Sequence, residues 1–382
     1  MKVPERLLLG PGPSPVSARV MRAMTQPALS HLDPAMMSML DDLRVRLDAV
    51  FRASPGAFSF AVSGTGTSGM EAAVANATKP GTRALAVVTG YFGDRLAQML
   101  ERYGATVSRI NVEWGRACDP EAVERALKAQ GADLVAVVHA ETSTGVLNPV
   151  ADVASAAAAS GALTIIDTVT SLGAMPVEAG QWGADICYSC SQKGLGAPSG
   201  MAPVTFSGRA LERRTPSRSF YLDLSLLQDY WVRRRYHHTI SAPLVYALHE
   251  SLLVVEEEGL EARWQRHERH HRALAAGLEV LGLSLLPPAS ERLWTLNAVR
   301  VPDGVDEGAV RRTLLEEFNI EVGAGLGPLA GRIWRVGLMG AGSTVNNVIL
   351  FISALERVLR AAGHRVASAS AAVSAVESAV SA

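Results

Sequence analysis

The sequence predicts an α/β protein: a large domain with a mostly parallel seven-stranded sheet between helices, followed by a small C-terminal α+β domain. Three observations predict this class. Near-continuous Val/Ile/Leu/Ala strands alternate with helical segments, as in a parallel sheet buried on both faces. After about residue 255 the pattern changes to long helices and a few short strands. With 382 residues, 48% of them hydrophobic, the chain is long enough for two cores.

Charge and cysteine content exclude several classes of function. The net charge is −1, from 36 basic and 37 acidic residues, so no overall field favours nucleic acid or an anionic membrane. Cys118, Cys187 and Cys190 include one C-x-x-C pair but no second pair and no histidines at zinc-ligand spacing, so we expect buried free thiols and no metal. No segment approaches the ~20 apolar residues of a membrane span, and neither a signal peptide nor a peroxisomal ending is recognisable. We expect a soluble, cytoplasmic protein.

The first elements lead from an arm to a glycine-rich loop. Residues 1–20 are rich in proline, which fixes φ and lacks an N–H donor, so we expect an extended arm with Gly10–Pro13 near a site. A partly disordered terminus is the alternative. Apolar spacing predicts a helix over 35–52 and a strand over 58–62, followed by a loop at 63–69 and a helix at 70–77.

The rest of the large domain, which we assign to 21–255, alternates regularly, and parallel sheets of this kind bind ligands outside the carboxyl ends of their strands. The predicted strands are 84–88, 106–112, 134–139, 163–166, 186–189 and 202–206, and the predicted helices are 91–103, 120–130 and 150–160.

The small domain, 256–365, contains helices and short strands, preceded by a linking helix. The predicted helices are 244–259, 260–281, 308–318 and 345–361, and the predicted strands are 293–301, 320–322 and 333–337. The helix over 260–281 carries a basic, histidine-rich face from Arg263 to Arg272. We expect this face to be solvated, with a binding patch as the alternative. Residues 366–382, rich in Ala, Ser and Val, are predicted to be a weakly ordered tail or a marginal helix.

One lysine, Lys193, stands among small residues between an apolar strand and a Gly/Pro-rich turn. Desolvation in a tight, uncharged pocket favours the neutral, nucleophilic amine. Alone, a Lys-Gly pair is typical of a surface turn. However, Asp167 ends another apolar strand 26 positions earlier (193 − 167). A lysine that forms a Schiff base and an aspartate that pairs with a pyridinium nitrogen are the two protein groups that pyridoxal phosphate requires.

The loop Gly64-x-Gly66-x-x-Gly69 follows a strand and opens a helix, so it matches the dinucleotide-binding pattern. That pattern requires an acidic residue about 20 positions later for the ribose, and Val87-Val88-Thr89-Gly90 has none. No P-loop Gly-Lys-Ser/Thr follows either. Hydroxyl groups around a helix N-terminus favour binding of one phosphate, and an ordinary capped helix is the alternative.

Three further residues could contact a ligand. Phe92 begins a helix at the same sheet edge, where its ring could stack on a heterocycle or pack in the core. Thr142 follows a strand and could reach the 3′-oxygen of pyridoxal or a substrate carboxylate, or serve only the turn. Arg335 interrupts an apolar strand, and a buried guanidinium requires an anion. Bidentate capture of an α-carboxylate fits this requirement, as does a structural ion pair.

Together these residues resemble the class V aminotransferases, a group of fold-type I pyridoxal-phosphate enzymes, and most closely the alanine–glyoxylate and serine–pyruvate (serine–glyoxylate) enzymes. The resemblance extends from Leu7 to about residue 362. Several blocks in the same order carry it: Leu7 to Ser14, Ser63-Gly64-Thr65-Gly66, Glu141-Thr142-Ser143-Thr144-Gly145, Asp167-Thr168-Val169, Ser191-Gln192-Lys193, Tyr236-His237-His238-Thr239 and Arg335-Val336-Gly337-Leu338.

The resemblance implies a role for each matched residue. Lys193 would bind pyridoxal 5′-phosphate covalently, and Asp167 would hold its ring nitrogen. Val169 would cover one ring face, and Phe92 stands at the stacking position where relatives often have tryptophan. The carboxylate of the substrate would be held by Arg335, Thr142 and the backbone near Gly12. The phosphate would be bound by Thr65, Gly66, Thr67 and Gln192, and by Tyr236 and Thr239 of a second subunit, which implies a homodimer with shared sites.

The implied function is a ping-pong transfer of an amino group from alanine or serine to glyoxylate or pyruvate. No second arginine is matched in the pocket, so small uncharged donors are favoured over dicarboxylates. The (S)-ureidoglycine–glyoxylate enzymes, which share the Glu-Thr-Ser-Thr-Gly turn, are the closest alternative. A cysteine desulfurase is less favoured because no cysteine follows Cys190, and a dehydrogenase lacks the ribose-binding acid.

Overall fold

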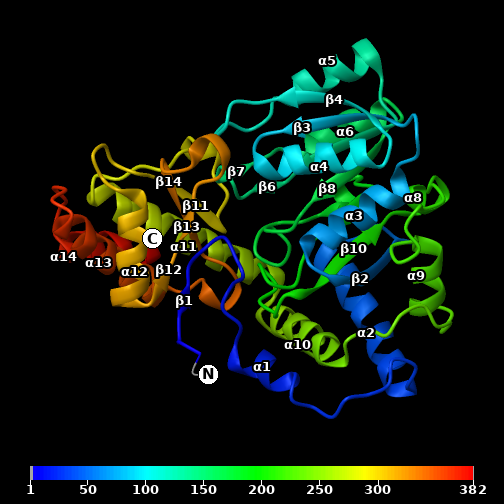
Figure 1. Ribbon diagram of the computed structural model, residues 1–382, viewed down its shortest axis with the longest axis horizontal. Coiled ribbons are helices and arrows are strands. Elements are labelled where there is room, and N and C mark those ends of the chain that lie inside the picture. Colours follow the sequence, from blue (N-terminus) through cyan, green and yellow to red (C-terminus); the bar gives the residue numbers. More distant parts are fainter. Residues whose placement is uncertain (1–2, 382) are drawn as a thin grey trace.

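A seven-stranded sheet forms the centre of the larger of two lobes (Figure 1). The computed structural model describes residues 3–381. The strand order is β2–β10–β9–β8–β5–β3–β4. The four pairings from β9 to β4 are parallel, and β10 runs antiparallel to both of its neighbours. This confirms the predicted, mostly parallel sheet. The strands are β2 (Phe58–Gly64), β3 (Arg83–Val88), β4 (Thr106–Asn111), β5 (Leu134–Val138), β8 (Leu163–Asp167), β9 (Ile186–Tyr188) and β10 (Gly200–Phe206).

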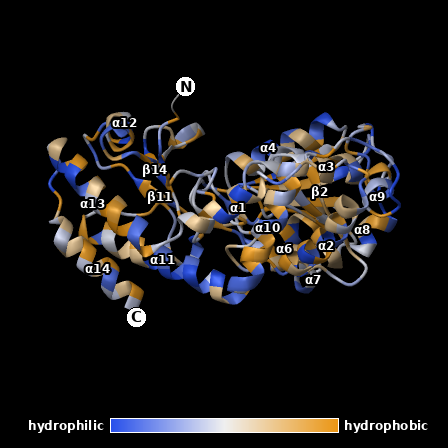
Figure 2. Cartoon of the chain, turned by 90° about the horizontal axis from the view of Figure 1, so that it is seen from below, coloured by the Kyte–Doolittle hydropathy of each residue, from blue (hydrophilic) through white to orange (hydrophobic). Residues whose placement is uncertain are grey.

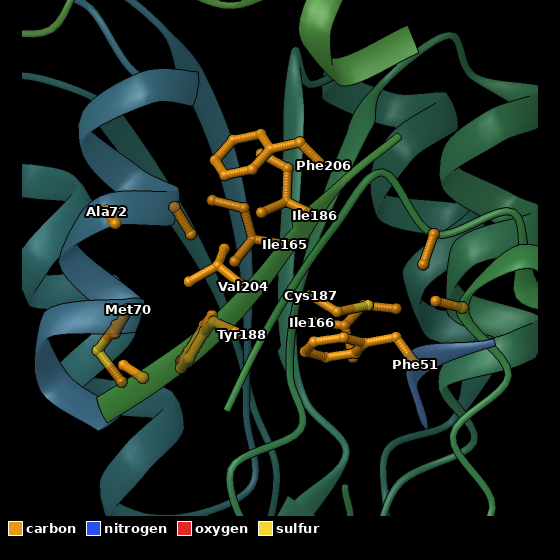
Figure 3. Close-up of a cluster of buried hydrophobic side chains, with 14 of the residues drawn as sticks. Phe51, Met70, Ala72, Ile165, Ile166, Ile186, Cys187, Tyr188, Val204 and Phe206 are labelled. Atoms are coloured by element: carbon orange, nitrogen blue, oxygen red, sulfur yellow. The ribbon is translucent and has the colours of Figure 1, made fainter. Parts of the chain in front are cut away.

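Helices cover both faces of this sheet. Adjacent residues of a strand point to opposite faces, so each strand places buried side chains on both sides. Figure 3 shows Ile165 of β8 on the side of Met70, and Ile166 on the opposite side with Phe51. Met70 belongs to α3 and Phe51 ends α2. The helices of this lobe are α2 (Pro34–Phe51), α3 (Gly66–Ala77), α4 (Tyr91–Arg102), α5 (Pro120–Gln130), α6 (Val150–Ala159), α7 (Ala179–Trp182), α8 (Gly208–Glu212), α9 (Leu224–Trp231) and α10 (Ala242–Glu258).

The smaller lobe has its own hydrophobic core around a three-stranded antiparallel sheet in the order β11–β14–β13. Its strands are β11 (Leu296–Arg300), β13 (Gly323–Ala324) and β14 (Ile333–Gly337), and its helices are α11 (Leu260–Val280), α12 (Glu307–Phe318), α13 (Val345–Ala361) and α14 (Ala369–Ser381). Each strand and helix predicted from apolar spacing is present, with ends shifted by a few residues. The helix expected at 70–77 begins earlier, at Gly66.

The N-terminal arm joins the two lobes. Its first strand, β1 (Leu7–Leu8), pairs in parallel with β12 (Ile320–Glu321) of the small lobe. The chain then passes close to the large sheet, where the Ser14 N–H donates to the carbonyl of Gln192 at 2.8 Å. The arm ends in a short helix, α1 (Ala18–Ala23), whose N-cap is Ser17. Residues 3–17 contain no helix, as expected, but the chain bends at 10–13, and the helical residues 18–20 fall within the segment that was expected to be extended.

The C-terminal segment was expected to be a weakly ordered tail or a marginal helix, and most of it forms a helix, α14. Figure 2 shows α14 beside α13 and α11. Ala372 and Val376 of α14 are fully buried. A Cβ added to Gly277 of α11 would lie 2.8 Å from a methyl of Val376, so a residue without a side chain is needed for this close approach. The small residues that made the segment resemble a loose tail are the ones that allow this packing.

The basic face of α11 was expected to be solvated, and this expectation was wrong. Arg263, His267, His270 and His271 are all buried, whereas Arg269 and Arg272 are exposed. Within residues 3–381 no helix has both the length and the apolar character needed to cross a membrane. In the same range no three metal-ligating side chains come together.

Candidate active site

A cavity of about 170 Å³ lies at the carboxyl ends of the parallel strands and brings together nine residues selected from the sequence. The segments that follow β2, β3, β8 and β9 contribute to its wall, together with the turn after β5. The nine residues are Thr65, Gly66, Thr67, Phe92, Thr142, Asp167, Val169, Gln192 and Lys193.

Lys193 is held in an enclosed, mostly uncharged position. Its ammonium donates a hydrogen bond to the carbonyl of Pro11 in the arm. Burial lowers the pKa of Lys193 below its ordinary value, because desolvation disfavours the ammonium. A Cβ on Gly12, whose φ is +114°, would overlap the Lys193 amine. The arm therefore approaches the lysine so closely that only glycine fits, and the amine is poised to act as a nucleophile.

Asp167 ends β8 with its carboxylate buried. Oδ2 accepts a hydrogen bond from the Tyr188 hydroxyl at 2.6 Å, and Oδ1 accepts from the Val169 N–H at 2.8 Å. Burial raises the pKa of Asp167 to about 7, an effect that these two hydrogen bonds partly offset. A cationic partner, such as a protonated ring nitrogen, would favour the ionised carboxylate at this position.

Tyr188 was not selected from the sequence. It sits opposite Asp167 in the parallel register of β8 and β9, and its fully buried phenol donates to the carboxylate. The contact between Tyr188 and Asp167 depends on how β8 and β9 pair, and the residues around Tyr188 in the sequence do not reveal this pairing.

The opposite end of the cavity can receive a phosphate. Thr65 is the N-cap of α3, but its side chain makes no capping hydrogen bond, so its hydroxyl is free for a ligand. The Oε1 atom of Gln192 is buried and has no hydrogen-bond partner within residues 3–381. A Cβ on Gly66 would lie 3.1 Å from Val169, so a larger residue would narrow the cavity. The free N–H groups of the helix N-terminus and the Thr65 hydroxyl are donors that fit the phosphate of a pyridine cofactor, whose ring nitrogen would pair with Asp167.

Arg95 is a second residue that the sequence did not single out. It lines the cavity from the second turn of α4. Its guanidinium lies over the rings of Tyr91 and Phe92, at 5.1 and 5.2 Å from their centroids, and its Nη1 lies 3.4 Å from the Thr67 hydroxyl. Arg95 follows Phe92 by three residues and Tyr91 by four, and side chains at these spacings lie together on a helix. This spacing is the sequence signal that could have identified Arg95. Arg95 is thus an arginine of the cavity wall that lies outside the blocks matched to the family.

Glu141 joins two walls of the cavity. Its buried carboxylate accepts hydrogen bonds from the Gly93 N–H at 3.0 Å and from the hydroxyl and N–H of Ser143, at 2.5 and 3.1 Å. Burial raises its pKa, and these donors oppose the rise. Glu141 thus holds the start of α4, which carries Phe92, against the turn that carries Thr142.

Arg335 lies in the middle of β14, almost fully buried. Its Nε donates to the carbonyl of Ala324 at 2.6 Å, and its Nη1 lies 3.5 Å from the carbonyl of Thr142. No carboxylate within residues 3–381 forms an ion pair with it, so the structural ion pair considered above is not seen in this chain. Burial lowers the pKa of Arg335 to about 10. A buried cation bonded only to carbonyls is suited to receive an anion.

Four of the residues selected from the sequence do not line this cavity. Gly12 and Arg335 lie directly behind its wall, against Lys193 and Thr142, whereas Tyr236 and Thr239 lie elsewhere on the surface. Tyr236 is 64% exposed, with its ring 5.1 Å from that of His31, and Thr239 is also exposed. The fold of one chain therefore does not bring them to Lys193.

The comparisons with known proteins agree with this geometry. Residues 8–334 match the family model described as aminotransferase class-V. The chain belongs to this family. A curated relative, the (S)-ureidoglycine–glyoxylate transaminase of Bacillus subtilis, is 37% identical over 93% of this chain and 91% of its own length. The alanine–glyoxylate aminotransferase of Drosophila melanogaster is 35% identical over 94% and 93% of the two chains. The solved alanine–glyoxylate aminotransferase from Nostoc sp. is 48% identical over 94% and 97%, with a TM-score of 0.92.

As a class V aminotransferase, this chain has the fold-type I architecture and uses pyridoxal 5′-phosphate. The cavity between Asp167, Lys193 and the N-terminus of α3 fits that cofactor in size and in chemistry. Both the enzyme class and the cofactor that were expected from the sequence are thereby confirmed.

Proposed function

We propose that this aminotransferase transfers an amino group from a small amino acid, alanine or serine, to glyoxylate or pyruvate, with Lys193 and Asp167 as its catalytic residues. One observation carries the proposal: Lys193 and Asp167 line one cavity, and the unpaired Arg335 lies beside its wall, 3.5 Å from the carbonyl of Thr142 and close enough for its charge to lower the pKa of Lys193. A covalent anchor, a ring-nitrogen partner and a carboxylate receptor are the three protein groups that amino-acid chemistry on pyridoxal phosphate requires.

Each group on the cavity wall has a distinct task. When bound, pyridoxal phosphate supplies an aldehyde that condenses with amines and a ring that accepts electrons from the Cα of the substrate. Lys193 would hold the cofactor through its amine, and the free amine would take the proton from the Cα of the substrate as a base and donate it, as an acid, to the C4′ carbon of the cofactor. Asp167, oriented by Tyr188 and the Val169 N–H, would keep the ring nitrogen protonated. Phe92 and Val169 would pack against the ring, and Thr65, Gly66, Thr67 and Gln192 would bind the phosphate; all six line the cavity.

The positions of the two arginines favour a donor with an uncharged side chain. Arg335 and Thr142 receive the α-carboxylate, and the backbone near Gly12 closes over it. Arg95 is next to Thr67, at the phosphate end, so it offers no second carboxylate site beside Arg335. The relatives named for alanine and glyoxylate support this choice.

An amino group taken from (S)-ureidoglycine is the second candidate. The relative of that name from Bacillus subtilis is 37% identical and its structure superimposes with a TM-score of 0.96. A desulfurase activity is disfavoured, because Cys190, the cysteine that lines the cavity, is buried and burial raises its pKa to about 12. A thiol of this kind is not a nucleophile.

The homodimer and the compartment are part of the proposal. Tyr236 and Thr239 are exposed here and would contact the phosphate of a second subunit, so that two chains share each site. Cys118, Cys187 and Cys190 are all buried free thiols, which supports a reducing compartment such as the cytoplasm.

A panel of amino donors tests the proposal. Purified protein with added pyridoxal phosphate is incubated with alanine, serine, aspartate or (S)-ureidoglycine, and with glyoxylate, pyruvate or 2-oxoglutarate as acceptor. We expect the highest kcat/KM for alanine or serine with glyoxylate, and no turnover by Lys193→Ala. A preference for ureidoglycine would select the second candidate. A preference for aspartate, or transamination by Lys193→Ala, would refute the assignment.

A further inference from the structure

The peptides around Lys193 are held by groups from outside the large lobe. The carbonyls of Gln192 and Lys193 accept hydrogen bonds from the N–H and the hydroxyl of Ser14, at 2.8 and 2.9 Å. The next carbonyl, that of Gly194, accepts from Nη2 of Arg263 at 2.8 Å. The arm and α11 thus bind three consecutive carbonyls of the loop that carries the lysine.

Arg263 also binds the loop that follows Asp167. Its Nε donates to the carbonyl of Gly173 at 2.7 Å, so one guanidinium bridges Gly173 and Gly194. The two loops touch at this point, because a Cβ on Gly194 would overlap the carbonyl of Leu172. The loops after β8 and β9, which carry the two catalytic groups, are therefore joined by one side chain of α11.

The guanidinium is in turn fixed on its own side. Its Nη1 pairs with Glu258 at 2.5 Å, and Glu258 also pairs with Arg266 at 2.5 Å. The Arg263 side chain is only 4% exposed. Because a planar guanidinium presents its donors at fixed angles, three partners of known position determine its orientation completely.

His267 extends this network to the segment after β14. Its Nε2 accepts the Gly340 N–H at 3.1 Å, so its Nδ1 carries the proton and donates to the carbonyl of Arg263 at 2.7 Å. A Cβ on Gly340 would lie 3.3 Å from the carbonyl oxygen of Lys193. The small lobe, which supplies Arg335, thus contacts the lysine loop both through a side chain and through its backbone.

We propose that Arg263 is a positioning residue for Lys193: by fixing the Gly194 carbonyl against Gly173, it sets the direction in which the lysine amine meets the cofactor and the Cα of the substrate. The inference rests on the proposed role of Lys193. Arg335, which receives the carboxylate, is untouched by Arg263, so loss of this contact affects the chemical step more than substrate binding.

The test compares Arg263→Met and Arg263→Lys with Arg269→Met, a matched change at an exposed arginine of the same helix. Each holoenzyme is assayed for kcat and KM with its best amino donor. The visible absorbance of the lysine-bound cofactor is titrated with pH. We expect Arg263→Met to lower kcat by about 100-fold, the cost of a displacement of roughly 1 Å. We also expect little change in KM and a shifted titration midpoint. For Arg263→Lys we expect a kcat between those of Arg263→Met and the unmodified protein. For Arg269→Met we expect the same kcat and titration midpoint as for the unmodified protein.

A folded Arg263→Met protein, judged by circular dichroism, with unchanged kcat and titration midpoint would overturn the inference. If Arg263→Met fails to fold, Arg263→Lys decides by the same two readouts, because it keeps the charge beside Glu258 but not both carbonyl contacts. An unmodified protein with no lysine-bound absorbance would instead refute the role of Lys193, and the inference with it.

Discussion

A buried carboxylate lines the cavity and a buried guanidinium lies beside its wall, and neither has an ionic partner within residues 3–381. Asp167 accepts hydrogen bonds from Tyr188 and Val169, and Arg335 bonds to carbonyls. Burial shifts the pKa of each towards its neutral form, to about 7 and about 10. Burying an unpaired charge costs free energy, and ligands that supply the opposite charges offset this cost. A site whose charged groups are already in place before the ligand binds is preorganised.

Arg95 gives the first prediction at the residue scale. Its guanidinium lies beside Thr67 and over Phe92, where it can bind the cofactor phosphate. A hydrogen bond to a charged group is worth about 1.5–3 kcal/mol. Because Arg95 is partly exposed, we expect its hydrogen bond to contribute the lower value of this range, about 1.5 kcal/mol. Arg95→Met should therefore raise the Kd of pyridoxal phosphate roughly tenfold.

Cofactor titration by fluorescence measures this change. Arg102→Met is the control, because Arg102 is exposed at the far end of the same helix. An unchanged Kd in Arg95→Met would show that this arginine does not reach the phosphate.

Among the elements, α14 shows how a segment of low complexity can carry stability. Its contact with α11 depends on Val376, which is fully buried against Gly277. Removing two buried methyl groups costs about 2 kcal/mol at roughly 0.8 kcal/mol per buried carbon, plus any cavity left behind. We therefore expect Val376→Ala to lower the free energy of unfolding by about this amount, as measured by urea denaturation.

Val373→Ala provides a matched control, because Val373 is on the same helix but only half-buried. We expect Val373→Ala to lower the free energy of unfolding by less than Val376→Ala does. Equal effects of the two substitutions would contradict the packing of α14, and a weakly ordered tail would then describe this segment better.

On the scale of the whole molecule, an aromatic cluster next to the phosphate loop is left partly uncovered. Phe220 and Tyr236 are 73% and 64% exposed, and the Tyr221 hydroxyl donates to the carbonyl of Ser63 at 3.3 Å. Exposed apolar surface beside a site is typical of an interface. The cluster supports the proposal that a second subunit covers it and completes the site.

Complementation between variants tests this shared site. Lys193→Ala and Tyr236→Ala are each expected to be impaired, the first completely. In a mixed dimer, one of the two sites would combine an intact Lys193 with an intact Tyr236. Co-expression should therefore restore activity above that of either variant, and sedimentation should give twice the mass of one chain. Activity that never exceeds that of Tyr236→Ala alone would contradict a shared site.

The sequence predicted that Lys193, Asp167 and most of the cavity wall would lie together, because these residues lie at the ends of apolar strands or in the loops that directly follow them. In a parallel sheet such loops meet at one edge whatever the strand order. Arg263 shows where the same approach failed. The helical face rich in arginine and histidine was predicted to be solvated. Arg263 on this face instead donates to backbone carbonyls of distant loops. Every residue has a backbone carbonyl, so the sequence does not indicate which of them will accept such a hydrogen bond.

By itself, the sequence determined the alternation of strands and helices and singled out Lys193 and Asp167 as the proposed catalytic pair, since periodicity and strand-end positions are local properties. Only the tertiary structure decided that Tyr188 orients Asp167, that Arg95 enters the cavity and that Arg263 holds the lysine loop. These contacts depend on strand register and on how helices pack, which arise from interactions between residues far apart in the chain.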